Sequence, residues 1–273
     1  MRDLGEGRQG AGGMFRALIV SALLALTGCP HKAIVRPYPA PPAADVVGQV
    51  TRRGEIATSL KAETKTDVRM GKERANVTVY ILAAPGGKLR FQALNPNDSL
   101  AADLASDGTR FCFLDTRANC GDCGPATPEN VARLIRIPLQ PDEVVTVLMG
   151  GAPLLPDPTP EVTWDDEDGR EILTLEADGW KQKVILDGKD KRWDLLLAEL
   201  HDPRGKLAWR VRHKDFRAVK TKSGETVRLP AASLFEQAGD TVKIEWREQS
   251  IGEPLDDGKF QIELQEGLPA CGQ

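Results

Sequence analysis

The chain has 273 residues, of which 41% are hydrophobic and 28% charged, so it can bury a sizeable core and is not disordered throughout. Its formal net charge of −4 provides no basic footprint for nucleic acid. Three histidines argue against a multi-histidine metal site, and five cysteines are few for a disulfide scaffold of this length. We therefore expect one large domain or two small ones, with no metal, no cofactor and no nucleic-acid partner.

The N-terminus indicates a lipoprotein signal peptide over residues 1–28. Residues 17–26 are an apolar run, interrupted only by Ser21 and preceded by Arg16. A run of this length is typical of a signal-peptide core and is too short to span a membrane. It ends in Leu26-Thr27-Gly28-Cys29, which resembles the bacterial lipobox and implies cleavage before Cys29 and lipidation of that residue. The alternative is an ordinary secretory signal with an incidental cysteine.

A lipidated Cys29 would anchor the mature chain stably, because a single acyl chain is marginal and a processed lipoprotein carries several. Pro30, and not Asp, follows the cysteine, which by analogy with the enterobacterial sorting rule favours the outer membrane and a periplasm-facing body. We expect residues 29–42 to be the lipidated cysteine and a Pro-rich tether that holds the body, residues 43–273, away from the bilayer. Starts at Met1 and at Met14 give the same mature chain.

The body begins with an expected short helix over residues 43–56 and continues mostly as strands. Asp107-Gly108 and Asp178-Gly179 are strong hairpin dipeptides that join neighbouring strands. Apolar and polar residues alternate along most of these segments, which is typical of an antiparallel sheet open to water on one face. We expect about ten strands, with the clearest at residues 77–84, 88–94, 100–106, 110–115, 172–177, 180–186, 207–213, 242–246 and 260–264.

The middle of the chain predicts two short helices. Thr127-Pro128-Glu129 reads as an N-cap, a first-turn proline and a first-turn acid, and Pro141-Asp142-Glu143 begins the second helix. Residues 152–163 contain four prolines and are expected to form an irregular loop. A long sheet must hide its apolar face, so the helices are expected to form a lid with these apolar residues: Val131, Leu134, Ile135, Val144, Val147 and Leu148. The predicted fold is mainly β (α+β), an incomplete antiparallel β-barrel or strongly curved sheet covered by a few short helices.

This order of elements behind a lipobox resembles the LolA/LolB superfamily of lipoprotein carriers and receptors, over about residues 43–266. The resemblance implies an incomplete barrel with an apolar cavity for acyl chains, and the lipid anchor places the chain nearer the receptor branch. Its partners would be acyl chains or lipoproteins, delivered by a periplasmic carrier protein. The stretches that carry the resemblance are residues 55–62, residues 124–130, Ile137-Pro138-Leu139 with Leu148-Met149-Gly150-Gly151, and Val242-Lys243-Ile244-Glu245-Trp246.

Large apolar residues on the alternating strands are the candidates for the walls of such a cavity. For each residue taken alone, ordinary core packing is the alternative; the case for a cavity is collective, because two short helices give little cover for some ten strands. Binding there would need only burial of acyl chain and no catalytic group. The candidates are Leu89, Phe91, Phe111, Phe113, Leu173, Leu175, Trp180, Trp209, Val211, Val242, Ile244 and Trp246.

Four cysteines remain after Cys29: Cys112, Cys120, Cys123 and Cys271. An even number in an oxidising compartment indicates two disulfides, for which three pairings exist. We expect Cys120–Cys123 as a local clip in a Gly-rich turn and Cys112–Cys271 as a pin for the C-terminal tail. A redox CxxC and a partial metal site are the alternatives, although no βαβ pattern surrounds the motif.

The sequence contains no catalytic signature. The acidic run before Gly169 fails the EF-hand spacing and reads as a hairpin turn. His201 and His213 stand beside charged residues and are expected to be solvated. No nucleophile-elbow, phosphate-loop or zinc-protease motif is present, so we do not expect an enzyme. Three functions remain in view: a lipid-anchored acyl-chain binder that receives and inserts lipoproteins, an anchored interaction module with a filled interior, and a thiol-disulfide protein.

Overall fold

A computed structural model describes residues 32–56, 58–135 and 139–271, with backbone only at 53–56 and 133–135. Residues from Ile34 onward form one unit of the chain, and the description below concerns that unit. The predicted signal peptide, Cys29 and the side chains of Leu134 and Ile135 lie outside the described residues. Within the described ranges, no helix combines the length and apolar character needed to cross a bilayer.

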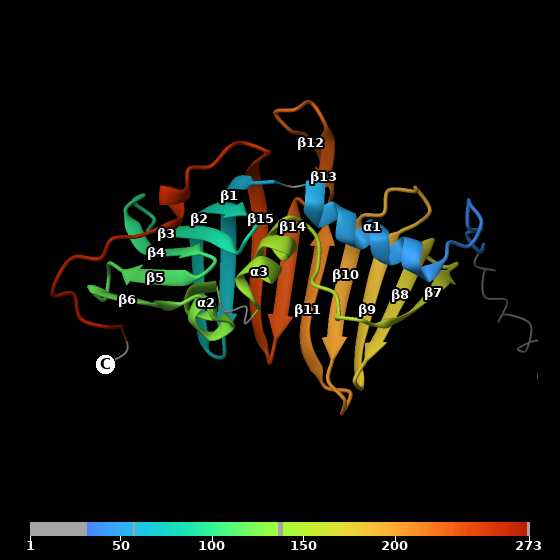
Figure 1. Ribbon diagram of the computed structural model, residues 1–273, viewed down its shortest axis with the longest axis horizontal. Coiled ribbons are helices and arrows are strands. Elements are labelled where there is room, and N and C mark those ends of the chain that lie inside the picture. Colours follow the sequence, from blue (N-terminus) through green and yellow to red (C-terminus); the bar gives the residue numbers. More distant parts are fainter. Residues whose placement is uncertain (1–31, 57, 136–138, 272–273) are drawn as a thin grey trace, which may run out of the picture. The chain divides into compact units, whose positions relative to one another are not determined.

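Thirteen of the fifteen described strands form one antiparallel sheet, and the other two form a small ribbon, β12–β13 (Figure 1). The spatial order is β6-β5-β4-β3-β2-β1-β15-β14-β11-β10-β9-β8-β7, so the sheet is open, with β6 and β7 at its edges. The strands are β1 (Leu60–Met70), β2 (Glu73–Ala84), β3 (Lys88–Leu94), β4 (Leu100–Asp107), β5 (Arg110–Asp115), β6 (Cys120–Pro125), β7 (Thr159–Asp165), β8 (Arg170–Ala177), β9 (Trp180–Asp187), β10 (Leu195–His201), β11 (Leu207–Lys214), β12 (Arg217–Lys220), β13 (Thr226–Leu229), β14 (Ala232–Gln237) and β15 (Asp240–Ile251).

The sheet is built mostly from hairpins between consecutive strands, as the Asp-Gly turns predict. Gly108, between β4 and β5, has a φ of 93°. A Cβ at this position would lie 1.9 Å from the carbonyl oxygen of Gly86, so only glycine fits there. The non-local step is the pairing of β1 with β15, which joins the two halves of the sheet.

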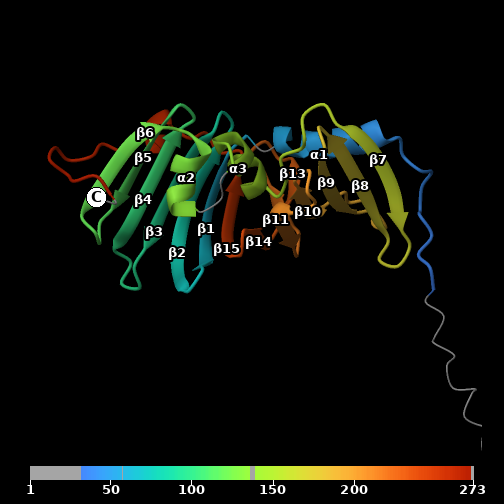
Figure 2. The same cartoon turned by 90° about the horizontal axis from the view of Figure 1, so that it is seen from below.

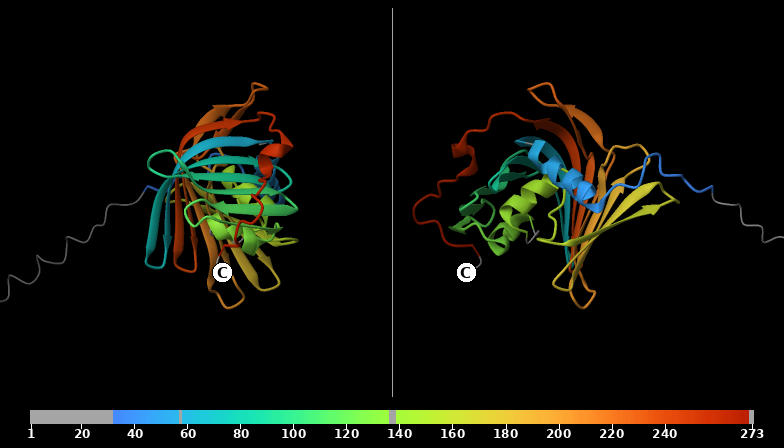
Figure 3. Two further views of the ribbon diagram at one scale, coloured as in Figure 1. Left: turned by 90° about the vertical axis from the view of Figure 1, so that its left-hand side faces the viewer. Right: turned by 45° about the vertical axis from the view of Figure 1, so that its right-hand side comes forward.

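Three helices cover one face of the curved sheet (Figures 2 and 3). These are α1 (Ala43–Ile56), which contacts β7 and β8, α2 (Pro128–Ile135), which contacts β4 and β5, and α3 (Pro141–Leu148), which contacts β2 and β3. Alternate strand residues are buried on this inner face, while their neighbours face outward.

Helix α3 is held at its N-terminal end, and the loop that follows it is also tied to the sheet. The Glu143 side chain accepts the backbone N–H of Gln140 at 2.7 Å, which closes a capping box in front of Pro141. The Asp142 carboxylate accepts the N–H of Gly87 at 2.6 Å, which ties the helix to the β2–β3 turn. Beyond the helix, Gln182 on β9 donates to the Pro153 carbonyl at 2.6 Å and accepts the Leu155 N–H at 2.9 Å, and so secures the following loop.

Several expected elements need correction. Residues 260–264 do not form a strand: Phe260 ends a short 3-10 helix, η1 (Asp257–Phe260), and the chain continues as an irregular tail. Its apolar residues alternate because they pack against the outer face of the sheet, where Leu264 and Leu268 lie against Gly121. The irregular loop expected over 152–163 ends earlier, at β7, and the expected turn at 120–123 lies in strand β6.

Two further expectations differ from the structure. His213 is 1% exposed, because its ring contacts the Ser233 hydroxyl and the Gly151 carbonyl at 2.9 and 3.1 Å. The segment expected to be a free spacer packs on the sheet from Ile34 onward, because Arg36 and Tyr38 find partners on β7 and β8. The acidic run at 165–169 does form the expected turn, in which Asp165 accepts the N–H of Glu167 at 3.0 Å.

Candidate functional site

An apolar pocket of about 280 Å³ lies between helix α3 and the inner face of one half of the sheet. Strands β1 to β5 and β15 supply its walls, and Val144 and Leu148 of α3 form its roof. Polar groups gather at Thr66 and at the β5–β6 turn, where Asp115 and Arg117 lie. The remaining lining residues are Val68, Met70, Ala75, Val77, Val79, Ile81, Phe91, Ala93, Ala101, Ala102, Phe113, Val242 and Ile244.

The pocket exists because small side chains face α3. Ala93 on β3 and Ala102 on β4 are directly paired across the two strands, and Ala101 lies beside them. All three are less than 10% exposed, so they are interior positions that carry only a methyl group. The roof residues Val144 and Leu148 are also buried, and the pocket is the volume that the alanines leave below them.

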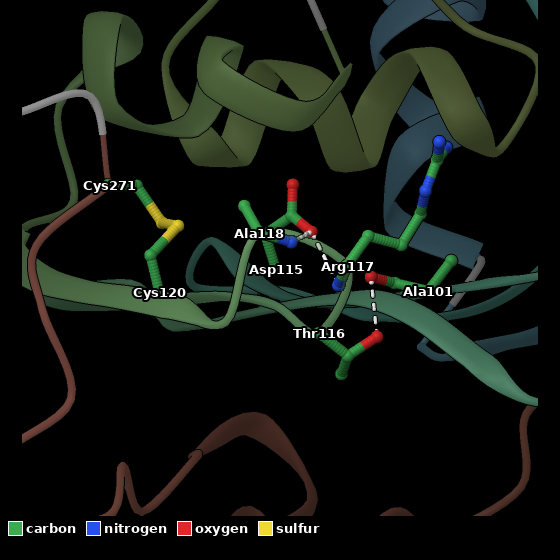
Figure 4. The surroundings of a disulfide bond; sticks show 7 residues. All are labelled: Ala101, Asp115, Thr116, Arg117, Ala118, Cys120 and Cys271. Atoms are coloured by element: carbon green, nitrogen blue, oxygen red, sulfur yellow. Dashed lines mark hydrogen bonds between the residues drawn. A yellow bond between two sulfur atoms is a disulfide. The ribbon is translucent and has the colours of Figure 1, made fainter.

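Arg117 lies at the pocket in the turn between β5 and β6, and hydrogen bonds from neighbouring side chains fix the backbone of this turn (Figure 4). The Asp115 carboxylate accepts the N–H groups of Arg117 and Ala118, both at 2.9 Å. The Thr116 hydroxyl donates to the carbonyls of Leu100 and Ala101. Figure 4 shows the Arg117 side chain rising on the side of the helices, opposite to Thr116. Arg117 is exposed and is the cation among the pocket-lining residues.

The structure divides the expected cavity residues into two groups. Six of the expected wall and lid residues line the pocket: Phe91, Phe113, Val242, Ile244, Val144 and Leu148. The others lie elsewhere, packed in the core or half-buried at its margin: Leu89, Phe111, Leu173, Leu175, Trp180, Trp209, Val211, Trp246, Val131 and Val147. Trp209, for example, stacks on Phe235 with ring centroids 6.5 Å apart. The expected wall residues on β8, β9 and β11 therefore lie outside this pocket.

The sequence analysis did not identify the alanines that line the pocket or the lining residues on β1. The signal was present in β1, where Thr64, Thr66, Val68 and Met70 alternate with charged residues. Thr64 and Thr66 are buried polar residues whose hydroxyls contact each other at 3.0 Å, and Thr64 donates to the Val79 carbonyl at 3.0 Å. Because these hydroxyls are satisfied within the sheet, they leave this wall compatible with an apolar ligand.

The four expected cysteines do form two disulfides, but the expected pairing is wrong. The bonds are Cys112–Cys123 and Cys120–Cys271. Cys112 and Cys123 are direct cross-strand partners on β5 and β6. Cys120 and Cys123 lie three residues apart on an extended strand, a span of about 10 Å that a disulfide cannot bridge. With these thiols oxidised, and no cluster of metal-ligating side chains among the described residues, the CxxC is structural here.

An open antiparallel sheet with helices on one face and an apolar pocket between the two layers is the LolA-like fold. No family model matches the sequence, and no curated protein matches it either. Several solved structures nevertheless share the fold.

A LolA superfamily protein from Nitrosomonas europaea superposes with a TM-score of 0.53 at 14% identity, over 82% of this chain and 99% of that chain. A domain of an outer membrane lipoprotein-sorting protein from Vibrio parahaemolyticus gives 0.54 at 10% identity, over 80% and 95%. A DUF1329 family protein from Desulfovibrio piger gives 0.53 at 12% identity, over 81% and 98%. At these identities the similarity establishes the fold alone.

Proposed function

We propose that this protein binds the acyl chain of an amphiphile in the pocket under α3. The observation that carries the proposal is the pocket itself, an apolar space of about 280 Å³ walled by strands and roofed by one short helix. Burial of apolar surface supplies the binding energy without directional groups. No reaction is needed for this role, which agrees with the absence of a catalytic motif from the sequence.

The size of the pocket limits the ligand. A methylene group is about as large as a water molecule, whose share of liquid volume is about 30 Å³. The pocket of about 280 Å³ therefore holds about nine methylene groups. At about 0.8 kcal/mol each, they contribute about 7 kcal/mol before the costs of association. The chain alone would then give no better than about 10 μM affinity, which suits a protein that must release what it binds.

We further propose that Cys29 is lipidated and that the body faces the periplasm from the outer membrane. The lipobox-like Leu26-Thr27-Gly28-Cys29 supports the anchor, and Pro30 after the cysteine supports the outer membrane. One of the structures that shares the fold is named for lipoprotein sorting. The finer role is then to receive lipoproteins from a periplasmic carrier protein and insert them into the outer membrane.

Native mass spectrometry tests the acyl-binding proposal. Residues 30–273 would be exported to the periplasm without Cys29, so that the body is isolated in its own compartment with its disulfides formed. We expect additional mass that matches an acyl chain or phospholipid and that detergent removes. A ligand-free mass, with no binding of added fatty acid, would instead favour an anchored interaction module with a filled interior.

A further inference from the structure

The segment that precedes α1 is fastened to one end of the sheet. The Ile34 N–H donates to the Asp166 carbonyl in the β7–β8 turn at 2.7 Å. The Trp164 indole N–H on β7 donates in turn to the Ile34 carbonyl at 2.8 Å. These two bonds join the segment to the edge strand β7 and to the turn that follows it.

A buried ion pair strengthens this attachment. The Arg36 guanidinium pairs with both carboxylate oxygens of Glu171 on β8. Its Nε lies 2.9 Å from Oε1, and its Nη2 lies 3.0 Å from Oε2. The Glu171 side chain is 0% exposed, and pairing with a cation offsets the cost of burying its carboxylate. The guanidinium also lies over the Trp164 ring, 5.3 Å from its centroid.

Tyr38 completes the docked segment, which we define as Ile34–Tyr38. Its ring meets the Trp164 ring edge-on at 6.3 Å and the Trp193 ring at 5.6 Å. Burial and the Glu171 charge raise the pKa of Tyr38, so its hydroxyl stays protonated. A Cβ at Gly188 would lie 2.6 Å from Trp164 and 2.8 Å from the Tyr38 hydroxyl, so a glycine is required beneath the two rings.

We propose that the docked segment holds the β7 edge of the sheet at the bilayer surface, with the pocket half of the body facing away from it. This inference rests on the proposed lipidation of Cys29. Five residue steps separate Cys29 from Ile34, and a fully extended chain covers at most about 3.6 Å per residue. Ile34, which is hydrogen-bonded to the β7–β8 turn, therefore stays within about 18 Å of the anchored cysteine.

The pocket half lies much farther along the sheet. Eight strand spacings separate β7 from β2 in the sheet order, and neighbouring strands are about 4.8 Å apart. This gives about 38 Å along the sheet between the anchored edge and the pocket wall. Figure 2 shows β7 at one end of the unit and β1 to β6 at the other. A ligand would then enter the pocket from the periplasm, where a soluble carrier can reach it.

Electrostatic attraction to the membrane does not account for the proposed position of the β7 edge at the bilayer. The β7–β8 turn carries four consecutive acids, Asp165-Asp166-Glu167-Asp168, which an anionic lipid surface repels. The nearby Lys189, Lys191 and Arg192 offset them only in part. The short covalent link must therefore position the edge, and the length of that link is the variable to test.

The test is energy transfer on the full-length, lipidated protein in vesicles of phosphatidylcholine that contain an acceptor-labelled lipid headgroup. A donor dye is placed at Glu167→Cys in the β7–β8 turn or at Lys72→Cys in the β1–β2 turn, both exposed positions. We expect several-fold greater transfer from position 167 than from position 72. Equal transfer from both positions, in protein that floats with the vesicles, would overturn the inference.

Two kinds of variant distinguish the docking contacts of the segment from the length of the covalent link to Cys29. A flexible Gly-Ser insertion between Ala33 and Ile34 keeps the docking contacts but lengthens the link, and should lower transfer from position 167. The Arg36→Ala/Tyr38→Ala variant should do the same by freeing the segment, whereas Arg69→Ala, which removes an exposed ion pair on β1, should have no effect. Unchanged transfer after the insertion would contradict the inference. Absence of acyl mass on Cys29 would overturn the proposed anchor, and this inference with it.

Discussion

The double substitution Ala93→Leu/Ala102→Leu is predicted to close the pocket while the fold is retained. The two alanines face each other across β3 and β4 on the pocket wall, and they are 7% and 8% exposed. Each change adds three carbons, which at about 30 Å³ each occupy about 90 Å³. The pair together takes about 180 Å³ of the pocket's 280 Å³.

The expected loss of affinity follows from the displaced ligand. One leucine excludes about three methylene groups, or about 2.4 kcal/mol, which is roughly a fifty-fold weaker Kd. The two leucines exclude about six, or about 5 kcal/mol, which is more than a thousand-fold. The free energy of unfolding should not fall by the roughly 1–3 kcal/mol typical of overpacking, because the new methyl groups enter existing space.

The assay is displacement of a fluorescent fatty acid, with urea unfolding measured on the same preparations. Ala218→Leu is the matched control, because it adds the same side chain at an exposed position on β12, away from the pocket. It should leave the Kd unchanged. A double variant that binds fatty acid as well as the wild type, with unaltered stability, would refute the assignment of the pocket.

Three further predictions concern the pocket mouth, the disulfides and pH. Arg117→Gln should weaken binding of a fatty acid up to about five-fold, the effect of an exposed charge, and remove its salt dependence; an equal loss for a neutral monoacylglycerol would contradict a headgroup contact. Cys271→Ser should lower the free energy of unfolding by about 5 kcal/mol and Cys123→Ser by about 3, because the first opens a loop of 151 residues and the second one of 11; urea unfolding with equal losses would count against the chain-entropy argument. N–H groups of Arg110 and Thr109 hold the pKa of Asp107 below its ordinary value of 3.8. Its stabilisation is therefore present above that pH and is lost as the pH falls through the folded-state pKa. Asp107→Asn should flatten this loss in acid unfolding curves, and an unchanged slope would exclude the contribution.

Local pattern was enough to locate much of the sheet. Residues 88–94 are expected as a strand of alternating character, and β3 has these bounds with Leu89, Phe91 and Ala93 buried. The second expected helix, which begins at Pro141, is also found, because a first-turn proline and acids mark its start. Alternation and capping act over a few residues, so a single sequence carries them in full.

Long-range geometry was not accessible in this way. The pairing of β1 with β15 joins residues nearly two hundred positions apart, and no local pattern specifies it. The cysteine pairing failed for the same reason. The pairing depends on the strand register that sets Cys112 opposite Cys123. A turn predicted at 120–123 contains no such register. The tail at 260–264 alternates like a strand, but it finds its apolar partners on the outer face of the sheet.

The location of the pocket shows why large apolar residues were poor guides to a cavity. Both halves of the sheet carry the same inward alternation, so periodicity does not separate them. In one half, bulky side chains such as Trp209 and Phe235 stack and fill the space themselves. In the other, Ala93, Ala101 and Ala102 face α3 and leave the space open. Interiors normally pack with few voids, and the unfilled volume here lies where small residues are paired across neighbouring strands. Alanines at paired inward positions of neighbouring strands are therefore a signal for a ligand site that large apolar residues alone do not give.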